Sequence, residues 1–338
     1  MTERIDIVSP LLDVADAAEL MDALRKRWRA RHGNMAYFAG NRFQTRIEAC
    51  VKRKLSSVPG FLALRPEQRE PLRRLAREGA RILGPQTAHE VDELVAALHA
   101  EAPWIAAVSA AIQQQLLAAL SNGRKGLRLP PMLLVGSPGC GKSHYARRLA
   151  EFAGVPLRRI DVGSGSSGFR VGGVERGWGS ATPSVPVETL LATRVANPLM
   201  LVDEIDKSGV VYSDRGMSTS IATSLLEVLD PGTAAHYECP VHRVRIDVSN
   251  ISWILTANDL RGVPAPLQDR CRVIHVPEPG LPDLLRLYDR MTAEIDDVDT
   301  VADGRAHLAV FGAQGLSIRN LLAWVAVVRG YAHRPRHH

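Results

Sequence analysis

A glycine-rich loop that ends in lysine and serine is the clearest chemical feature of the sequence. The loop follows the apolar run Met132–Val135 and precedes an amphipathic stretch that ends at Gly154. It matches the pattern GxxxxGK[ST] with Gly136, Ser137, Pro138, Gly139, Cys140, Gly141, Lys142 and Ser143. In this pattern the glycines let backbone N–H groups surround phosphate oxygens, and the start of the following helix adds a positive dipole. We therefore predict that the loop binds the phosphates of a nucleotide.

Two carboxylates come directly after a second apolar run. Leu199–Val202 has the composition of a buried strand, and Asp203 and Glu204 follow it. An aspartate at this place can hold a magnesium ion through water, while the neighbouring glutamate can orient and deprotonate the water that attacks a γ-phosphate. Lys142 would reach the β- and γ-phosphates, and Ser143 would offer its hydroxyl to the metal. Together these residues predict hydrolysis of a nucleoside triphosphate with Mg²⁺ as cofactor.

Two further polar positions can serve the same reaction. The apolar run Ile251–Ala257 ends at Asn258, whose neutral amide can hold the attacking water beside Glu204. Arg270 stands just before the last apolar run, and an arginine at a subunit edge can enter the neighbouring subunit's site and stabilise transition-state charge. Arg272 is the competing residue for this role, and a plain surface salt bridge is the alternative for either arginine.

Short apolar runs alternate with helical patterns between residues 86 and 277. The strand candidates are Met132–Val135, Leu157–Val162, Leu199–Val202, Ile251–Ala257 and Val273–Val276. This alternation predicts an α/β fold of the P-loop NTPase type, with a parallel sheet flanked by helices. The spacing of apolar residues from Glu90 to Leu120 predicts one helix that leads into this domain. Residues 1–85 read as a short, basic, helical N-terminal region, and residues 278–338 as a small C-terminal helical lid.

The composition is typical of soluble globular proteins. The 338 residues are 46% apolar and 23% charged, and no apolar run approaches the roughly 20 residues that span a bilayer. The N-terminus lacks the pattern of a secretory signal, so we expect a cytoplasmic protein without a membrane partner. The four cysteines are scattered, which favours reduced thiols over disulfides or zinc ligands. A redox role for Cys140 or Cys271 is the less favoured interpretation.

Basic residues are concentrated near the N-terminus. The chain has a net charge of +6, and Lys and Arg outnumber Asp and Glu between Asp22 and Arg81. Helical spacing would align Arg69, Arg73, Arg77 and Arg81 in one stripe. A solvated face is the favoured interpretation, because no aromatic residues interleave with these arginines as stacking platforms would require. A nucleic acid or an acidic partner is the alternative.

The sequence from about Pro131 to Val328 resembles the AAA+ module of the Lon protease family. The resemblance extends beyond the phosphate-binding loop to Asp203–Lys207, Leu225–Pro231, His236-Tyr237 and Pro264–Arg270. It implies that the nucleotide is ATP and that Asp203 and Glu204 are the Walker B pair. It also implies that Asn258 is the sensor 1 residue and that Arg270 is the arginine finger.

Two more functional residues are implied by the resemblance alone. Arg319 would be sensor 2, because Ser317–Leu321 is similar to the family's Gly-x-Arg-x-Leu, with serine in place of glycine. The segment Gly172–Ser180 stands where the family carries its substrate-gripping pore loop, and Trp178 would contact a threaded polypeptide. The family usually has a bulky aliphatic residue where this chain has Gly179. A tryptophan buried in a subunit interface is the alternative for Trp178.

The departures from the family bear on function. Lon continues past its lid into a peptidase domain, whereas this sequence ends at His338, and the family's long N-terminal regions are replaced by the basic helical segment. We expect an ATP-hydrolysing ring ATPase, a homohexamer, that remodels or unfolds a protein substrate and lacks its own protease. A motor or loader acting on nucleic acid is the alternative. A nucleotide switch without turnover is disfavoured because Glu204, Asn258 and Arg270 are all present.

Overall fold

The computed structural model describes residues 3–13, 17–32, 40–55, 59–162, 167–173, 182–208, 211–212, 218–219, 221–312 and 316–332. The chain divides into two compact units. Unit 1 comprises Met1–Leu83, Ser164–Pro198 and Gly209–Ile251, and unit 2 comprises Gly84–Gly163, Leu199–Ser208 and Ser252–His338. Each unit is therefore assembled from separate stretches of the chain. The division into the segments 1–85, 86–277 and 278–338 stays a prediction.

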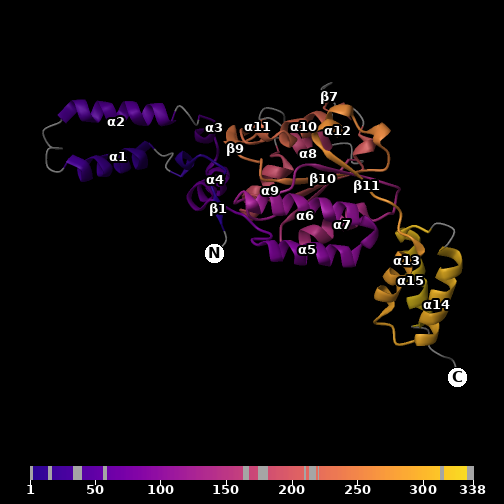
Figure 1. The fold of residues 1–338 in the computed structure, drawn as a ribbon. Helices are drawn as coiled ribbons and strands as arrows, with labels where there is room; N and C mark the ends of the chain where they lie inside the picture. The colour runs from indigo at the N-terminus through magenta and orange to yellow at the C-terminus, as the bar shows by residue number, and fades with distance from the viewer. Residues whose placement is uncertain are drawn as a thin grey trace. The chain divides into compact units, whose positions relative to one another are not determined.

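A parallel five-stranded sheet lies at the centre of unit 2 (Figure 1). Its spatial order is β11-β3-β10-β5-β4, with β11 Arg272–His275, β3 Met132–Val135, β10 Ser252–Ala257, β5 Leu199–Asp203 and β4 Leu157–Asp161. The three inner strands β3, β10 and β5 are buried along their whole length. Burial on both faces explains why they read as mainly apolar runs. The predicted α/β class is confirmed, and each predicted strand ends within one residue of its observed bounds.

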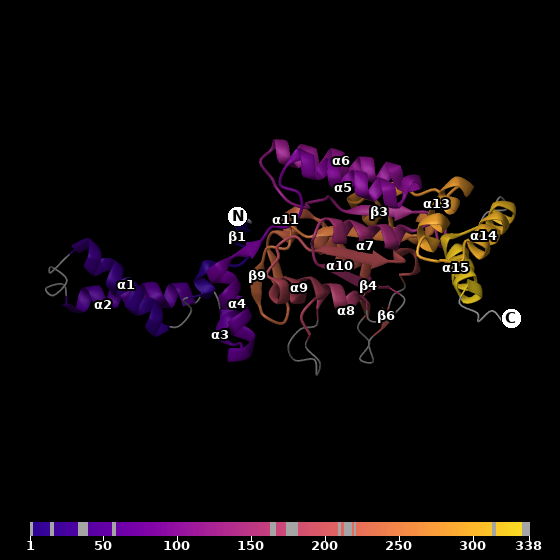
Figure 2. The same ribbon diagram turned by 90° about the horizontal axis from the view of Figure 1, so that it is seen from below.

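Three helices of unit 2 pack with one another and with the sheet: α5 Ala88–Glu101, α6 Ala106–Ser121 and α7 Lys142–Phe152 (Figures 1 and 2). The prediction of one helix from Glu90 to Leu120 is wrong. The chain leaves α5 at Ala102 and forms a 3-10 turn, Pro103–Ile105, before α6 begins. Pro103 has no backbone N–H to continue the hydrogen bonding of α5, although the apolar spacing runs on across the break.

The stretch Pro103–Ser121, which includes α6, is the one helical segment of the described chain that is long and apolar enough to cross a membrane. Length and composition are weak evidence, because core helices pass the same test. Val108, Ile112 and Leu116 of α6 are buried, and α6 packs against α5. These three side chains of α6 therefore belong to the protein core, although only 33% of the apolar window in Pro103–Ser121 is buried.

Three helices at the end of unit 2 share a core of their own. They are α13 Leu281–Thr292, α14 Val298–Phe311 and α15 Ile318–Ala332. The core consists of Leu284, Tyr288, Leu308, Leu321, Val325 and Val328. The Tyr288 hydroxyl donates to the Val301 carbonyl, and the Trp324 indole N–H donates to the Gly304 carbonyl. These contacts make the three helices a small bundle.

A charged cluster around Glu101 connects this bundle to α5 and α7. The Glu101 carboxylate lies 2.8 Å from His144 Nε2 on α7 and 3.2 Å from Arg290 Nη1 on α13. Burial raises the pKa of the Glu101 carboxyl, but the hydrogen bond with His144 and the charges of Arg290 and Arg148 outweigh burial and hold that pKa below its usual range. The cluster therefore favours an ionised Glu101.

Unit 1 contains short strands and several helices. Its elements are β1 Arg4–Ile5, α1 Ala17–His32, α2 Gly40–Leu55, α3 Pro59–Leu62, α4 Pro66–Glu78, β2 Ala80–Arg81, α8 Ser167–Gly172, α9 Val185–Thr193, β6 Val211–Tyr212, β7 Ser218–Thr219, α10 Ile221–Leu229, α11 Pro231–Ala234, β8 Tyr237–Cys239 and β9 Val244–Ile246. The strands pair as β1-β2, β6-β7 and β8-β9, each antiparallel.

The arginine stripe predicted from Arg69 to Arg81 is wrong at its end. Helix α4 stops at Glu78, Gly79 follows with φ +66°, and Arg81 lies on β2. Arg69 donates to two loop carbonyls, at 2.6 and 2.8 Å, and Arg77 pairs with Asp13 at 2.8 Å. These arginines have structural partners within unit 1, so a continuous solvated stripe is not formed.

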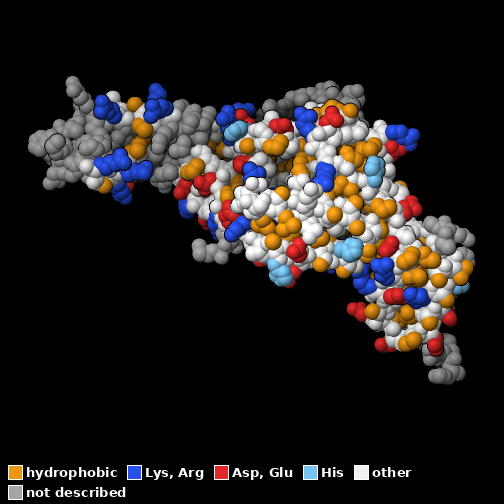
Figure 3. Space-filling view, in the orientation of Figure 1, with side chains coloured by type: hydrophobic (Ala, Val, Ile, Leu, Met, Phe, Trp, Pro, Cys, Tyr) orange, Lys and Arg blue, Asp and Glu red, His pale blue; other side chains and the backbone are white. Residues whose placement is uncertain are grey.

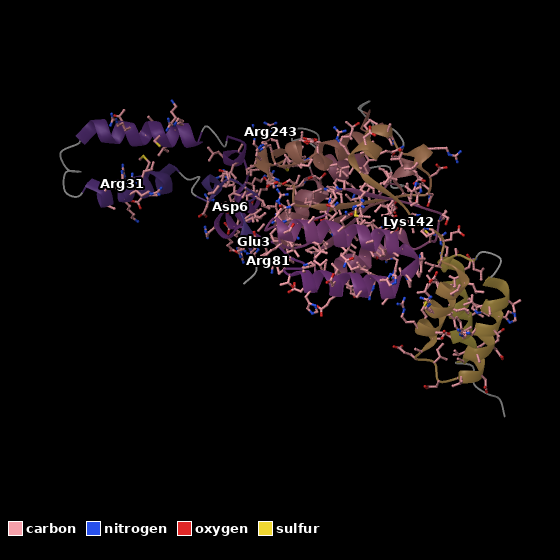
Figure 4. The ribbon with its side chains drawn as sticks, in the orientation of Figure 1. Glu3, Asp6, Arg31, Arg81, Lys142 and Arg243 are labelled. Atoms are coloured by element: carbon pink, nitrogen blue, oxygen red, sulfur yellow. The ribbon has the colours of Figure 1, made fainter. Side chains whose placement is uncertain are left out.

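The basic charge is instead concentrated on α1 and α2, which contact each other. The two helices hold ten Lys and Arg against three Asp and Glu, and their net charge of +7 exceeds the +6 of the whole chain. Figure 3 shows Lys and Arg side chains over the described parts of both helices, and Figure 4 labels Arg31 on α1. This pair of helices is the strongly basic part of the protein.

Candidate nucleotide-binding site

The loop between β3 and α7 has the glycine geometry of a phosphate-binding loop. Gly139 and Gly141 have φ of +84° and +100°, a region that favours glycine. A Cβ added to Gly136 would lie 2.3 Å from the Val276 carbonyl oxygen. Both the backbone path and the lack of space therefore require glycine here.

Lys142 is the first residue of α7 (Figure 4) and is only 7% exposed. Its ammonium donates to the Gly136 carbonyl at 2.7 Å and the Ser137 carbonyl at 3.0 Å, and it lies 3.3 Å from Asn258 Oδ1. The lysine is thus folded back on its own loop. It also connects the loop to the end of β10, where Asn258 stands.

Asp203 at the end of β5 is held by two hydroxyl groups. Ser143 Oγ donates to Asp203 Oδ1 at 2.7 Å, and Thr256 Oγ1 of β10 donates to the same oxygen at 2.6 Å. Asp203 and Thr256 are both buried. Hydrogen bonds to an ionised acceptor are among the stronger ones in proteins, so this carboxylate has a fixed orientation.

The second oxygen of Asp203 has a basic partner. Arg159 Nη2 of β4 lies 2.8 Å from Asp203 Oδ2 and 3.6 Å from Asp161 Oδ2. In the parallel pairing of β4 with β5, Asp161 is the register partner of Asp203. Arg159 therefore stands between two carboxylates at the same edge of the sheet.

Glu204 adopts an unusual backbone conformation and also has a basic partner. Its φ and ψ are 60° and 49°, which for a residue with a side chain is a strained, left-handed conformation of the kind that clusters at functional sites. Its backbone N–H donates to Thr256 Oγ1 at 3.0 Å. Its carboxylate lies 2.8 Å from Lys207 Nζ, and this hydrogen bond raises the pKa of Lys207.

Asn258 is positioned by a third acidic residue. Its backbone N–H donates to Asp206 Oδ2 at 3.1 Å, while Asp206 Oδ1 is buried and has no hydrogen-bond partner in the described part of the chain. A Cβ added to Gly262 would lie 2.6 Å from the Asp206 carbonyl oxygen. The turn that follows β5 thus packs tightly against the turn that follows β10.

Two elements that flank the loop contact its backbone. The Trp104 indole N–H donates to the Cys140 carbonyl at 2.9 Å, and the Ile318 N–H, at the start of α15, donates to the Gly139 carbonyl at 3.2 Å. A Cβ added to Gly139 would lie 3.8 Å from Cβ of Arg319, whose side chain is exposed. The first turn of α15 therefore lies against the loop, and it carries Arg319.

The comparisons with known proteins agree with this geometry. Residues 132–278 match the family model described as ATPase family associated with various cellular activities (AAA). This segment is an AAA ATPase domain. The match spans all five strands of the sheet and the loop between β3 and α7.

The AAA domain is similar to part of the Lon proteases. The chain is 35% identical to a Lon protease of Chlamydia pneumoniae over 167 residues, which is 49% of this chain and 20% of that protein. It is 36% identical to the mitochondrial Lon protease homolog of Mus musculus over 141 residues, or 42% of this chain and 14% of that protein. The chain thus spans a fifth or less of the length of these relatives. The relatives and the AAA domain support ATP hydrolysis.

Solved structures support the fold. A closed-state cryo-EM reconstruction of Hsp104 with ATPγS and FITC casein matches with a TM-score of 0.53 at 14% identity, over 92% of this chain and 58% of that one. An Hsp104-ADP complex of S. cerevisiae matches with a TM-score of 0.50 over 83% of this chain. At this low identity the likeness concerns the fold alone.

Some predicted site residues lie apart from this constellation. Arg270 is the last residue of α12 Ala265–Arg270, is exposed, and makes only a 3.5 Å contact with the Pro266 carbonyl in its own helix. Arg272 begins β11 and contacts Gln114 at 3.5 Å. Trp178 lies outside the described residues. The geometry within one chain therefore brings neither arginine to the AAA site.

The donor groups of the AAA site fit a nucleotide with magnesium. Ser143 Oγ and the Asp203 carboxylate are hard oxygen donors, which Mg²⁺ prefers, and the buried Ser137 Oγ has no hydrogen-bond partner among the described residues. In the described chain no group of three or more His, Cys, Asp or Glu side chains is placed to hold a metal ion. A magnesium ion would therefore depend on phosphate oxygens and water as well, which is its usual mode in phosphate-transfer sites.

Three residues of the AAA site do not feature in the sequence prediction. Thr256 is one of two hydroxyl residues, with Ser252, in the otherwise apolar run Ile251–Ala257, and that contrast is a signal in the sequence. Arg159 follows Arg158 within a strand candidate, where two charges in sequence are unusual. Trp104 lies within the apolar spacing from Glu90 to Leu120, and nothing local in the sequence indicates its bond to the loop.

Proposed function

We propose that this chain is an ATP-hydrolysing AAA+ ATPase that assembles as a homohexameric ring and remodels or unfolds a protein substrate. The observation that carries the proposal is the convergence of Lys142, Ser143, Asp203, Glu204 and Asn258 at one edge of the sheet. Magnesium, when bound with ATP, neutralises charge on the phosphates during transfer of the γ-phosphoryl group. The rest of the chemistry falls to side chains of the protein.

Each side chain of the site has a proposed task. Lys142 would exchange its loop carbonyls for phosphate oxygens, while Ser143 and Asp203 would hold the metal. Glu204 would leave Lys207 and take a proton from the attacking water, which Asn258 would orient. Replacing Glu204 with Gln keeps the shape and removes the base. The Glu204→Gln variant should bind ATP and release no phosphate; normal turnover in this variant would refute the assignment.

Arg270 is proposed as the arginine finger that acts on the neighbouring subunit, with Arg319 as sensor 2. The exposure of Arg270 at the end of α12 supports action in trans. Phosphate release by Arg270→Ala should fall by about 10³-fold or more, the effect of such residues elsewhere. Mixing Arg270→Ala with Glu204→Gln subunits should restore part of the activity, because some interfaces then pair an intact base with an intact finger. No restoration would argue against a shared site.

A protein substrate is the favoured target. The Lon relatives are proteases, and the Hsp104 reconstruction contains FITC casein. We expect unfolded casein to stimulate ATP hydrolysis and the stimulation to be lost in Trp178→Ala, the proposed pore-loop residue. The 338-residue chain should release no casein fragments. Casein that leaves the rate unchanged would count against protein remodelling while leaving ATP hydrolysis intact.

A motor acting on nucleic acid is the second candidate, and the charge of α1 and α2 favours it. In this case, DNA or RNA would stimulate ATP hydrolysis at low salt, and the effect would weaken as salt rises. A variant with Arg42, Arg46, Lys52, Arg53 and Lys54 changed to Gln would remove it. Stimulation by nucleic acid but not by casein would favour this candidate over the first.

The organisation of the chain and its compartment are part of the same proposal. The basic region 1–85 would select the target, the segment 86–277 would turn over ATP, and the lid 278–338 would move with the nucleotide. We place the protein in the cytoplasm. Mass measurement of the purified protein with ATP would show a hexamer, and cell fractionation would locate it.

A further inference from the structure

Arg159 is the basic residue of β4 that contacts Asp203. Its guanidinium is 2.8 Å from Asp203 Oδ2, and its side chain is 56% exposed, whereas that of Asp203 is 8% exposed. The other oxygen of Asp203 already accepts from Ser143 and Thr256. Arg159 therefore pairs with Asp203 Oδ2, the carboxylate oxygen that accepts from neither of these two hydroxyl groups.

Arg159 is not required by the fold at this place. The strand β4 is an edge strand, and Arg158, the preceding residue on the opposite face, is exposed as well. Arg158 carries the same charge as Arg159 and lies on the same strand. Arg159, unlike Arg158, is on the face of β4 that carries Asp161, and its guanidinium lies 2.8 Å from Asp203 Oδ2. The contact of Arg159 with Asp203 therefore depends on the face of β4 that the residue occupies, and not on positive charge alone.

We propose that Arg159 is a built-in cation that competes with magnesium for Asp203, and so sets the magnesium concentration at which the site binds nucleotide. This inference rests on the proposed nucleotide site. A guanidinium and a magnesium ion both require the charge of the same carboxylate. Metal binding then includes the release of Arg159 from Asp203.

Asp161 gives the released guanidinium another partner. Asp161 Oδ2 is 3.6 Å from Arg159 Nη2, and it is two residues along the same strand on the same face. Arg159 can therefore leave Asp203 and keep an ion pair. The two carboxylates form the two positions of a switch, with Arg159 on Asp203 without metal and on Asp161 with metal.

The test is the magnesium dependence of nucleotide binding, which requires no turnover. Fluorescent mant-ADP is titrated with MgCl₂, from EDTA-treated protein, for the parent chain, Arg159→Gln and Arg158→Gln. The half-saturating magnesium concentration should fall about tenfold in Arg159→Gln and change less than twofold in Arg158→Gln, which has the same charge change. Arg159→Lys, which keeps the charge, should stay closer to the parent.

Asp161→Asn supplies a second and opposite readout. Without Asp161, Arg159 loses its other partner, so the half-saturating magnesium concentration should rise. In the double variant with Arg159→Gln, Asp161→Asn should have little further effect on the half-saturating magnesium concentration, because Asp161 acts on the site through Arg159. Thermal unfolding of each variant checks that the fold is retained.

The outcomes separate the two levels of the proposal. A parent chain that binds no mant-ADP would overturn both the nucleotide site and the role of Arg159. Normal binding with the same magnesium dependence in Arg159→Gln and Arg158→Gln would overturn only the role of Arg159. A higher magnesium requirement in Arg159→Gln would show that Arg159 supports the metal instead of competing with it, and would equally refute the inference.

Discussion

Thr256 offers a sharp test of how the AAA site is held together. Its hydroxyl donates to Asp203 Oδ1 at 2.6 Å and accepts the Glu204 N–H at 3.0 Å, and the side chain is 1% exposed. One buried hydroxyl thus fixes the carboxylate of the first acidic residue and the backbone of the second. Replacing Thr256 with Val keeps nearly the same shape and removes both bonds.

The expected cost of Thr256→Val comes from two separate losses. The bond to ionised Asp203 contributes about 1.5 to 3 kcal/mol, as hydrogen bonds to charged groups do. The partly buried Glu204 N–H then loses its partner, which costs up to about 1 to 3 kcal/mol. The free energy of unfolding should fall by about 3 to 5 kcal/mol, a large part of the stability of a typical domain.

Thr256→Ser is the matched control, because it keeps the hydroxyl and removes only a methyl group. This substitution should lower the free energy of unfolding by about 1 kcal/mol, as the loss of one buried methyl group does. Urea unfolding of both variants, followed by tryptophan fluorescence and by circular dichroism, gives the comparison. Trp253 lies buried in the same strand and should report on this region. Free energies of unfolding within 1 kcal/mol of each other would refute the two-bond role of the hydroxyl.

Three further outcomes can be checked directly. Gly136→Ala should abolish mant-ADP binding while circular dichroism stays unchanged, because a Cβ would lie 2.3 Å from the Val276 carbonyl oxygen. Glu101→Gln should destabilise the protein at pH 7. Because the folded pKa of Glu101 lies below its ordinary value of 4.5, this contribution is full above pH 4.5 and is lost as the pH falls through the lowered pKa, so parent and variant should converge in urea unfolding at acidic pH. Burial raises the pKa of the Cys271 thiol to about 12, so iodoacetamide at pH 8 should label half-buried Cys50 in the native protein and spare Cys271, as read by mass spectrometry.

The sequence predicted those parts of the structure that depend on residues close to one another in the chain. Strands β3, β5 and β10 are buried on both faces, so each reads as a mainly apolar run in the sequence. The phosphate-binding loop is also local, because its glycines and Lys142 follow one another directly. These two features were sufficient to predict the α/β fold and the position of the candidate site.

Two errors arose where periodicity continued across a break. The apolar spacing passes through Pro103, and the arginine spacing passes through Gly79, so each pattern predicted one helix where the chain ends one. Both breaking residues were visible in the sequence. Periodicity describes which residues could share a face, but a residue without an N–H, or one with φ of +66°, decides whether the helix continues.

The contacts of Asp203 could not be predicted from the sequence, because they depend on strand order. Ser143, Arg159 and Thr256 come from three different segments, and they meet Asp203 because β5 lies between β10 and β4. The sequence contains all four residues but does not give the order of the strands. The register of β4 against β5 decides whether Arg159 meets Asp203, since a shift of one residue would turn Arg159 to the other face of the sheet.

The charge balance of the site explains why the structure is stable as it stands. Asp203 is paired with Arg159 and Glu204 with Lys207, while Lys142 is bonded to its own loop. Lys142, Asp203 and Glu204, three of the charged groups that the proposed reaction needs, thus each have a partner within the chain. In the proposed mechanism, phosphate oxygens replace the loop carbonyls around Lys142 and magnesium replaces Arg159 at Asp203, and each exchange has a cost. We therefore expect nucleotide and magnesium to bind more tightly together than either does alone, because only both together offer new partners to Lys142 and to Asp203.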